Sequence, residues 1–357
     1  DGEQFHRHAS FYRNQPLLVP PQTVRAALNE QLFSAVYWVF PSQRQAVKDL
    51  RLDNFKQQLA AVQILSDFER DGLNLKQGRF TTTVSGVPFH AVHPTALPQI
   101  EGPMLLHIDL GYFANSYLDE IKTPIYALLF DTATALRKTG WQPLAVTLSA
   151  SNVEGMVSSD FRFLFNDLQQ LLATPTLLGS PQPDNRQNRA HPHNHLQKRA
   201  DALYQAAMYQ SEQAMKNYRQ LVASRPDDAT AHYDLYRSGG THQALSEKLP
   251  HLDRAVALDP GYNWCYIELA GQELENNRLK PAIELLQKAL AADPANNLAR
   301  FELAKRLLED QRPEEAQPLL EELRALKWSP IYHPNVPALI ERLSDQLGKA
   351  ATTQESQ

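Results

Sequence analysis

The feature that most constrains the fold is a proline that recurs in the second half of the chain. Pro226, Pro260 and Pro294 follow one another at intervals of 34 residues, and a further interval ends at Trp328, two residues before Pro330. Proline has no backbone N–H and cannot continue a helix, so each of these prolines is expected to mark a helix end. A fixed period of this length predicts successive helix-turn-helix units.

The positions between these prolines keep the same phase. Small residues are needed where two helices cross closely, and bulky residues fill the space beside them. Pro281 and Pro313 fall near the starts of second helices, where proline is tolerated. The small position of the first helix holds Ala202, Ala270 and Ala304, with Tyr236 as the exception. The small position of the second helix holds Ala214, Ala282 and Ala316. The bulky position four residues later holds Tyr218, Leu252, Leu286 and Leu320.

This half of the chain resembles tetratricopeptide-repeat proteins over about four units, most clearly in NWCYIELAGQELENNRLKPAIELLQKALAADP. The resemblance predicts an all-α solenoid over residues 198–347, with a disordered tail at 348–357. We expect the second unit to be distorted, because Gly239-Gly240 interrupts it and Pro250 restarts its second helix late. The run VPALIERLSDQLGKA predicts a final helix that covers the last apolar face.

The same resemblance implies a binding surface. In tetratricopeptide proteins the first helices line a concave groove that commonly receives a peptide or a helix of a partner protein. Aromatic and arginine side chains are frequent hot spots of such interfaces. An alternative for Trp264 and Phe301 is packing against neighbouring helices, and both interpretations stay open at this stage. The family's groove positions correspond here to Tyr233, Arg237, Trp264, Ile267, Gly271, Phe301 and Lys305.

Residues 1–173 predict an α/β domain. Apolar runs at 35–41, 103–110 and 143–150 are typical of buried strands, and helical periods at 55–72 and 123–140 separate them. Alternating strands and helices favour a sheet with helices on its faces.

Residues 174–197, rich in Pro, Asn, Gln and His, predict a linker. Its alternating His191, His193 and His195 are read as part of a polar loop, with metal binding as the less favoured alternative.

Two stretches, VSGVPFHAVHPTALPQIEGPMLLHIDLGYF and WQPLAVTLSASNVEGM, resemble the arginase/deacetylase superfamily, in particular an uncharacterised arginase-like branch. The resemblance implies a three-layer fold around a mainly parallel sheet, with metal ions that activate water for amide hydrolysis. His107 and Asp109 share one face at the end of the expected strand. The family carries acidic residues where this chain has His107 and Gly111, so a carboxylate pair that bridges two metal ions cannot be built.

A site for one metal ion stays open as an alternative. The segment DGEQFHRHASFYR resembles the His-rich motif of the same branch and places His6 and His8 as ligands. Together with His107 and Asp109 they would supply three imidazoles and a carboxylate, a set that a divalent ion such as zinc accepts. The favoured alternative is that these histidines bind no metal. Ser149, at a strand end, could act as a nucleophile, but no partner base is identifiable.

The composition excludes several function classes. The net charge is −5 and no run of Lys and Arg provides a basic footprint, so nucleic-acid binding is not expected. No stretch approaches the roughly 18 apolar residues that cross a bilayer. The single cysteine, Cys265, excludes an intramolecular disulfide framework. If a leader has been removed before Asp1, the protein is exported, and the low cysteine content suits a bacterial periplasm.

Two functions from different classes follow. The first is an interaction or scaffold protein that captures a partner polypeptide in the repeat groove, with an arginase-like domain that has lost its activity and most simply needs no cofactor. The second is a metal-dependent amide hydrolase or deacetylase whose repeats recruit the substrate. The sequence favours the first, because the metal motif is degraded.

Overall fold

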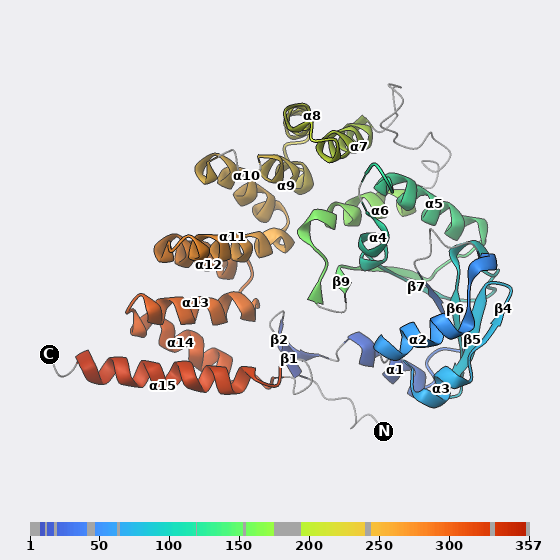
Figure 1. The fold of residues 1–357 in the computed structure, drawn as a ribbon, viewed down its shortest axis with the longest axis horizontal. Helices are drawn as coiled ribbons and strands as arrows, with labels where there is room; N and C mark the ends of the chain where they lie inside the picture. Colours follow the sequence, from blue (N-terminus) through green and yellow to red (C-terminus); the bar gives the residue numbers. More distant parts are fainter. Residues whose placement is uncertain are drawn as a thin grey trace. The chain divides into compact units, whose positions relative to one another are not determined.

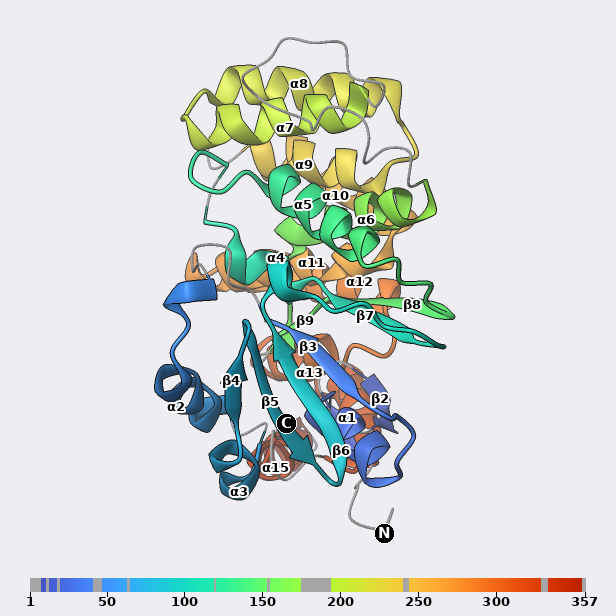
Figure 2. The same ribbon diagram turned by 90° about the vertical axis from the view of Figure 1, so that its right-hand side faces the viewer.

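The structure is a computed structural model, shown in two orientations in Figure 1 and Figure 2. It describes residues 8–10, 13–17, 20–40, 47–62, 65–118, 120–152, 155–174, 194–239, 244–328 and 333–354. The chain divides into two compact units. One comprises Ala27–His251, and the other comprises Asp1–Ala26 together with Leu252–Gln357.

The unit Ala27–His251 contains two groups of strands, the helices around them, and the first helices of the repeat half. Its strands are β3 (Val36–Val39), β4 (Asn74–Lys76), β5 (Arg79–Val84), β6 (Val87–Val92), β7 (Leu105–Asp109), β8 (Ala145–Ser149), β9 (Ser151–Asn152) and β10 (Gly155–Met156). Its helices include α2 (Leu52–Val62), α3 (Asp67–Asp71), α4 (Gly111–Ser116), α5 (Ile125–Lys138), α6 (Phe163–Ala173), α7 (Asn194–Ala207), α8 (Ser211–Ser224) and α9 (Ala229–Ser238). Helices α1 (Pro20–Asn29) and α10 (Leu245–Leu258) run across the unit boundaries.

Four strands form a mixed sheet in the order β3-β6-β5-β4. Strand β3 runs parallel to β6, whereas β4–β5 and β5–β6 are antiparallel. Two-residue turns with positive φ, Gln77-Gly78 and Ser85-Gly86, connect the antiparallel strands. Such turns match the twist of a hairpin and favour glycine. Gly78 is doubly required, because an added Cβ would lie 2.9 Å from a methyl group of Val47.

Strands β7 and β8 form a separate parallel pair, in register from Leu105↔Ala145 to Asp109↔Ser149. One face of the pair, including Ile108, packs on the apolar cluster of α5 and α6. On the other face, Leu105 is 60% exposed. The buried strand predicted at 103–110 is therefore present with one buried face, because Leu106 and Ile108 reach the core whereas Leu105 and His107 are exposed.

The three predicted strands are present as β3, β7 and β8, and the predicted helix at 123–140 is present as α5. Among the described strand pairings, however, only β3–β6 and β7–β8 are parallel, so the mainly parallel sheet is corrected to one small mixed sheet and separate two-stranded pairs. A three-layer arginase-like fold is not confirmed. The predicted helix at 55–72 is interrupted, because Ser66 and Glu69 form a capping box that begins α3.

The apolar core of α5 and α6 includes residues of the repeat half. Phe130, Leu164 and Leu168 belong to one cluster with Leu196 and Ala200 of α7. Figures 1 and 2 both show α5, α6 and α7 close together. The first repeat helix therefore completes the core of the preceding α/β region.

The unit formed by Asp1–Ala26 and Leu252–Gln357 contains the later repeats. Its elements are the antiparallel strands β1 (His8–Ser10) and β2 (Arg13–Leu17), a short 3-10 turn (Pro260–Asn263), and the helices α11 (Trp264–Glu275), α12 (Leu279–Ala292), α13 (Asn297–Glu309), α14 (Pro313–Arg324) and α15 (Val336–Gln354). We number the repeats one to four as α7–α8, α9–α10, α11–α12 and α13–α14. No helix in the described part of the chain has the length and apolarity needed to cross a bilayer.

The 34-residue period is confirmed by the turns inside the helix pairs. Tyr209, Asn277 and Gln311 each have φ near +59° (59°, 58° and 59°) and lie 68 and 34 residues apart. In each turn the next backbone N–H donates to a carbonyl five residues earlier, at 2.8 Å for the pairs Gln210–Gln205, Arg278–Glu273 and Arg312–Leu307. The equivalent turn of repeat two falls at 240–243, outside the described residues.

The recurring prolines occupy equivalent corners, as predicted. Pro226 lies between α8 and α9, Pro260 between α10 and α11, and Pro294 between α12 and α13. The predicted small and bulky interior positions of the repeats are all buried. The first helix of repeat two is short, because α9 ends at Ser238 after ten residues, whereas α11 and α13 have twelve and thirteen. The predicted late start of the second helix at Pro250 is wrong, because α10 begins at Leu245, one period of 34 residues after the start of α8, and continues through Pro250.

The last helix covers the end of the repeats. Val336, Ile340 and Leu343 of α15 share a cluster with Leu320 and Trp328. The helix continues to Gln354, through most of the segment 348–357 predicted as disordered. Leu347 packs against this cluster, and the alanines, lysine and glutamine that follow favour helix.

Candidate functional site

The predicted groove residues belong to a set that recurs at 34-residue intervals along the first helix of each repeat. This set extends the prediction to repeat one, for which no groove residue was named from the sequence. We call the set the inner face. It consists of Leu196, Arg199 and Leu203; Thr230, Tyr233 and Arg237; Trp264, Ile267 and Gly271; and Leu298, Phe301 and Lys305.

In repeat one the inner face contacts the chain's own helices α5 and α6. Leu196 lies in their apolar cluster, and Leu203 packs against it. The guanidinium carbon of Arg199 lies 5.8 Å from the centroid of the Phe163 ring, within the range of a cation–π contact. Helix α6 therefore occupies this part of the inner face.

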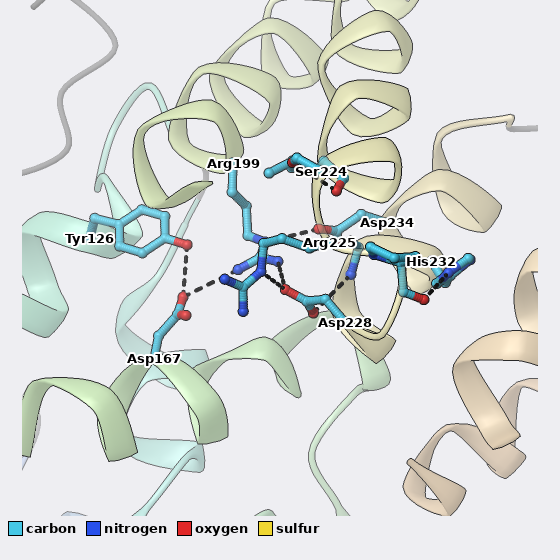
Figure 3. Close-up of polar contacts among 11 residues, drawn as sticks. Tyr126, Asp167, Arg199, Ser224, Arg225, Asp228, His232 and Asp234 are labelled. Carbon is cyan, nitrogen blue, oxygen red and sulfur yellow. Dashed lines mark hydrogen bonds and ion pairs between the residues drawn. The ribbon is translucent and has the colours of Figure 1, made fainter. Parts of the chain in front are cut away.

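Arg199 is 2% exposed and lies among three carboxylates (Figure 3). Its Nε donates to Asp234 Oδ2 at 3.0 Å. Its Nη1 lies 3.6 Å from Asp167 Oδ2, and its Nη2 lies 3.6 Å from Asp228 Oδ2. Tyr126 of α5 donates its hydroxyl to Asp167 at 2.8 Å. These contacts join α5 and α6 to α7 and α9.

Asp228 also has a local role. Its side chain accepts a hydrogen bond from the backbone N–H of Ala231 and caps the start of α9. Arg225 Nε donates to the same carboxylate at 2.8 Å. Burial raises the pKa of Asp228, but Arg199 and Arg225 together lower it by more, so the net pKa is below its usual range. This carboxylate therefore stays ionised.

The other two carboxylates are less well compensated. Burial raises the pKa of Asp234 to about 7, although the charge of Arg199 opposes this shift. Burial also raises the pKa of Asp167. With two guanidinium groups facing three carboxylates, one proton on Asp234 balances the charge of the cluster.

In repeat two the inner face contacts the segment that leads into α6. Asp160 lies in the 3-10 turn Ser159–Phe161, and its backbone N–H donates to the capping side chain of Ser158. Tyr233 donates its hydroxyl to Asp160 Oδ1 at 2.5 Å. Arg237 donates to both oxygens of the same carboxylate, at 3.0 and 3.3 Å. The predicted groove residues of this repeat are thus occupied by the chain itself.

Repeats three and four differ. Trp264, Ile267, Leu298 and Lys305 are half-buried. A Cβ added to Gly271 would meet no atom of the described residues within 4 Å. Phe301, in contrast, is buried in the cluster that also holds Leu320 and Trp328, which supports the packing interpretation for this residue.

The inner-face cation of repeat four, Lys305, differs from Arg237 of repeat two in its partners. Within the described part of the chain, Lys305 takes part in no hydrogen bond or ion pair. The neighbouring Arg306 pairs with Glu302 at 3.1 Å and with Glu309 at 2.7 Å. Lys305 is therefore a half-buried positive charge whose partner is not supplied by these residues.

The predicted strand-end residues lie together at the carboxyl ends of β7 and β8. His107 Nδ1 is 2.8 Å from the Thr147 hydroxyl. Ser149 donates to Asp109 Oδ2 at 2.6 Å and lies 3.2 Å from His107 Nε2. The other oxygen of Asp109 accepts the backbone N–H of Gly111 at 2.7 Å. Because the serine lies between the two, this is not the order of a Ser-His-Asp relay, in which the histidine is central.

The predicted four-ligand metal site is only partly visible. His6 and the side chain of His8 lie outside the described residues, as do His191 and His193. Among the described side chains, no group of three or more His, Cys, Asp or Glu is arranged to hold a metal ion. The set of His6, His8, His107 and Asp109 therefore stays a prediction.

No family model matches this chain, and no curated protein matches it. The solved structures similar to it include a crystal structure of MamA protein, which is 14% identical and covers 45% of this chain and 88% of its own, with a TM-score of 0.30. A MamA RS-1 ArsTM double mutant is 16% identical and covers 47% and 100%, with a TM-score of 0.30. A further crystal structure of MamA is 16% identical and covers 43% and 95%, with a TM-score of 0.27. The helix pairs and their 34-residue turns define the repeat architecture of this chain independently of these neighbours.

Proposed function

We propose that this chain is a protein-interaction scaffold in which repeats three and four bind a partner polypeptide. The observation that carries the proposal is the contrast between the two pairs of repeats. In repeats one and two the inner face contacts a helical segment of the same chain. In repeats three and four the equivalent positions include half-buried apolar side chains, Gly271, where an added Cβ would meet no described atom, and Lys305, with which none of the described residues forms a hydrogen bond or ion pair.

The α/β region has a structural role in this proposal. Its helices α5 and α6 hold the first two repeats through the shared core and the Arg199 cluster. Its strand-end residues His107 and Asp109 hydrogen-bond with Thr147 and Ser149. We further propose that this region is a pseudoenzyme derived from an arginase-like ancestor. Stoichiometric metal in the purified protein that is lost when His107 and Asp109 are replaced would contradict this.

Gly271 offers a sharp test. Replacing it with tryptophan places a large side chain on the inner face, where an added Cβ meets no described atom. Gly271→Ala is the matched control, because it changes the helix but leaves most of the space. We expect affinity capture from an extract of the source organism, read by mass spectrometry, to enrich the same proteins with the native chain and Gly271→Ala. Equal enrichment by Gly271→Trp would refute the proposed site, provided that circular dichroism shows an unchanged helical signal.

A further inference from the structure

The chain carries its own example of what the inner face binds. Residues 158–173, SSDFRFLFNDLQQLLA, combine an acidic turn with an amphipathic helix. Asp160 at the start meets Tyr233 and Arg237 of repeat two. Phe163 and Asp167, further along, meet Arg199 of repeat one. The segment is thus recognised through one carboxylate at its start, an apolar stripe, and a second carboxylate inside that stripe.

Each inner-face residue of repeats one and two has a counterpart 68 residues later, or two periods, in repeats three and four. The cation Arg237 corresponds to Lys305, and the aromatic Tyr233 corresponds to Phe301. At the start of the first helix, the apolar Leu196 corresponds to the apolar Trp264. Of the two groups that receive the start of the segment, the cation is therefore retained, whereas Phe301 lacks the hydroxyl with which Tyr233 contacts Asp160 and packs in the cluster of its own repeat.

Two inner-face positions differ in a way that changes the preferred ligand. Arg199, which receives the internal carboxylate Asp167, corresponds to Ile267. Leu203, which packs on the apolar cluster, corresponds to Gly271, where an added Cβ would meet no atom of the described residues within 4 Å. A carboxylate facing Ile267 would lose its water without gaining a cation, which is unfavourable. A larger apolar side chain would fill the space beside Gly271.

We infer that repeats three and four bind a helical segment of another protein that begins with an acidic residue, placed against Lys305, and continues as an apolar stripe without an internal acid. This inference rests on the proposed function and adds the chemical class of the partner. Its carriers are the charge of Lys305, the apolar Ile267 and the space beside Gly271.

Synthetic peptides provide the test. The probe is the sequence of residues 158–173 with Asp167→Leu and a fluorescent label, and its binding to the full-length chain is measured by fluorescence anisotropy. We expect it to bind, with at least about tenfold weaker binding to the Lys305→Glu and Gly271→Trp variants. The unmodified sequence should bind more weakly than the probe, because Asp167 would face Ile267. A probe that also carries Asp160→Lys should lose affinity for the native chain and regain it for Lys305→Glu.

The outcomes separate this inference from the proposed function. If the probe does not bind, but Gly271→Trp still abolishes capture of a natural partner, the partner class is wrong and the interaction site stands. If neither effect is seen, both fail. Binding that depends on Arg237 but not on Lys305 would mean that the probe displaces the chain's own segment, which overturns the inference. A self-association in sedimentation experiments that Lys305→Glu abolishes would show that a second copy occupies this face, and would overturn it as well.

Discussion

Replacing Arg199 with methionine removes the guanidinium that three buried carboxylates share. Methionine keeps much of the apolar volume of the side chain, so the change is mainly one of charge. In the variant Asp167 and Asp234 would be left buried at the junction of α6, α7 and α9, without the cation that offsets their burial. Asp228 would keep Arg225.

The expected loss follows from these surroundings. Removing one partner of a buried ion pair typically costs about 3–5 kcal/mol, because the remaining charge has lost its water and gained no counterion. Here the loss should be near that range at pH 8 and smaller at pH 5, because the two orphaned carboxylates can then take up protons. The effect should be local to the α/β region and the first two repeats, where the cluster lies.

Urea unfolding followed by far-UV circular dichroism measures the loss, and hydrogen exchange of α6 and α7 locates it. The matched control is Arg225→Met, which removes a half-exposed cation from the same cluster and should cost less than about 1 kcal/mol. A loss below about 1 kcal/mol for Arg199→Met at pH 8, or a loss that is the same at pH 5, would refute the charge argument. Replacing Arg199, Asp167 and Asp234 together by apolar residues should recover most of the stability.

Three further predictions follow from single residues. Asp234, with a folded-state pKa of about 7, keeps a proton that the unfolded chain releases near pH 4. The unfolding free energy should therefore fall as the pH rises from 4 to 7, by up to about 1.4 kcal/mol per pH unit, and level off above pH 7. In urea titrations, Asp234→Asn should flatten this profile. Gly271→Ala should raise the unfolding free energy by up to about 1 kcal/mol in thermal scans, because glycine disfavours a helix interior. Gly78→Ala should lower the unfolding free energy by more than about 1 kcal/mol, since φ is +76° and Val47 blocks the new Cβ. Gly102→Ala should lower it by less, because φ is also positive there but no described atom lies within 4 Å of the new Cβ.

The repeat half was predictable because its signals are local. Each proline ends a helix within one repeat, and the interior alanines and leucines pack against helices that are near in sequence. The short first helix of repeat two was predictable for the same reason, since Gly239 directly follows the last residue of α9, whereas the late start expected at Pro250 was wrong. The turn residues Tyr209 and Gln311 were not singled out, because neither side chain favours positive φ.

The α/β region was predicted less well. The hairpin turns at Gln77-Gly78 and Ser85-Gly86 had a signal in their glycines, but the second was interpreted as part of an arginase-like motif. The capping box at Ser66 was also present in the sequence and divided a helix that apolar periodicity had joined. The number of strands that pair with β7 depends on tertiary contacts, which local patterns do not contain.

The Arg199 cluster was missed for a different reason. An arginine in a helix is normally exposed, and its burial here depends on Asp167, Asp228 and Asp234, which lie 29 to 35 residues away. One signal was available, because Arg199 precedes the predicted groove residue Tyr233 by one period of 34 residues. Extending the groove register to repeat one would have placed a charge on the inner face and raised the question of its partner.

On the inference above, the same position would also explain how one chain holds two kinds of segment on similar surfaces. An inner face with only apolar residues would accept the chain's own α6 in either pair of repeats, because hydrophobic packing is weakly directional. Arg199 makes repeats one and two selective for a segment with an internal carboxylate, and Asp167 supplies it. On the same inference, Ile267 would make repeats three and four selective against this segment, since Asp167 would be buried there without a cation. A single charge difference at equivalent positions therefore keeps the internal segment in place and, on the inference above, leaves the second pair of repeats available to another protein.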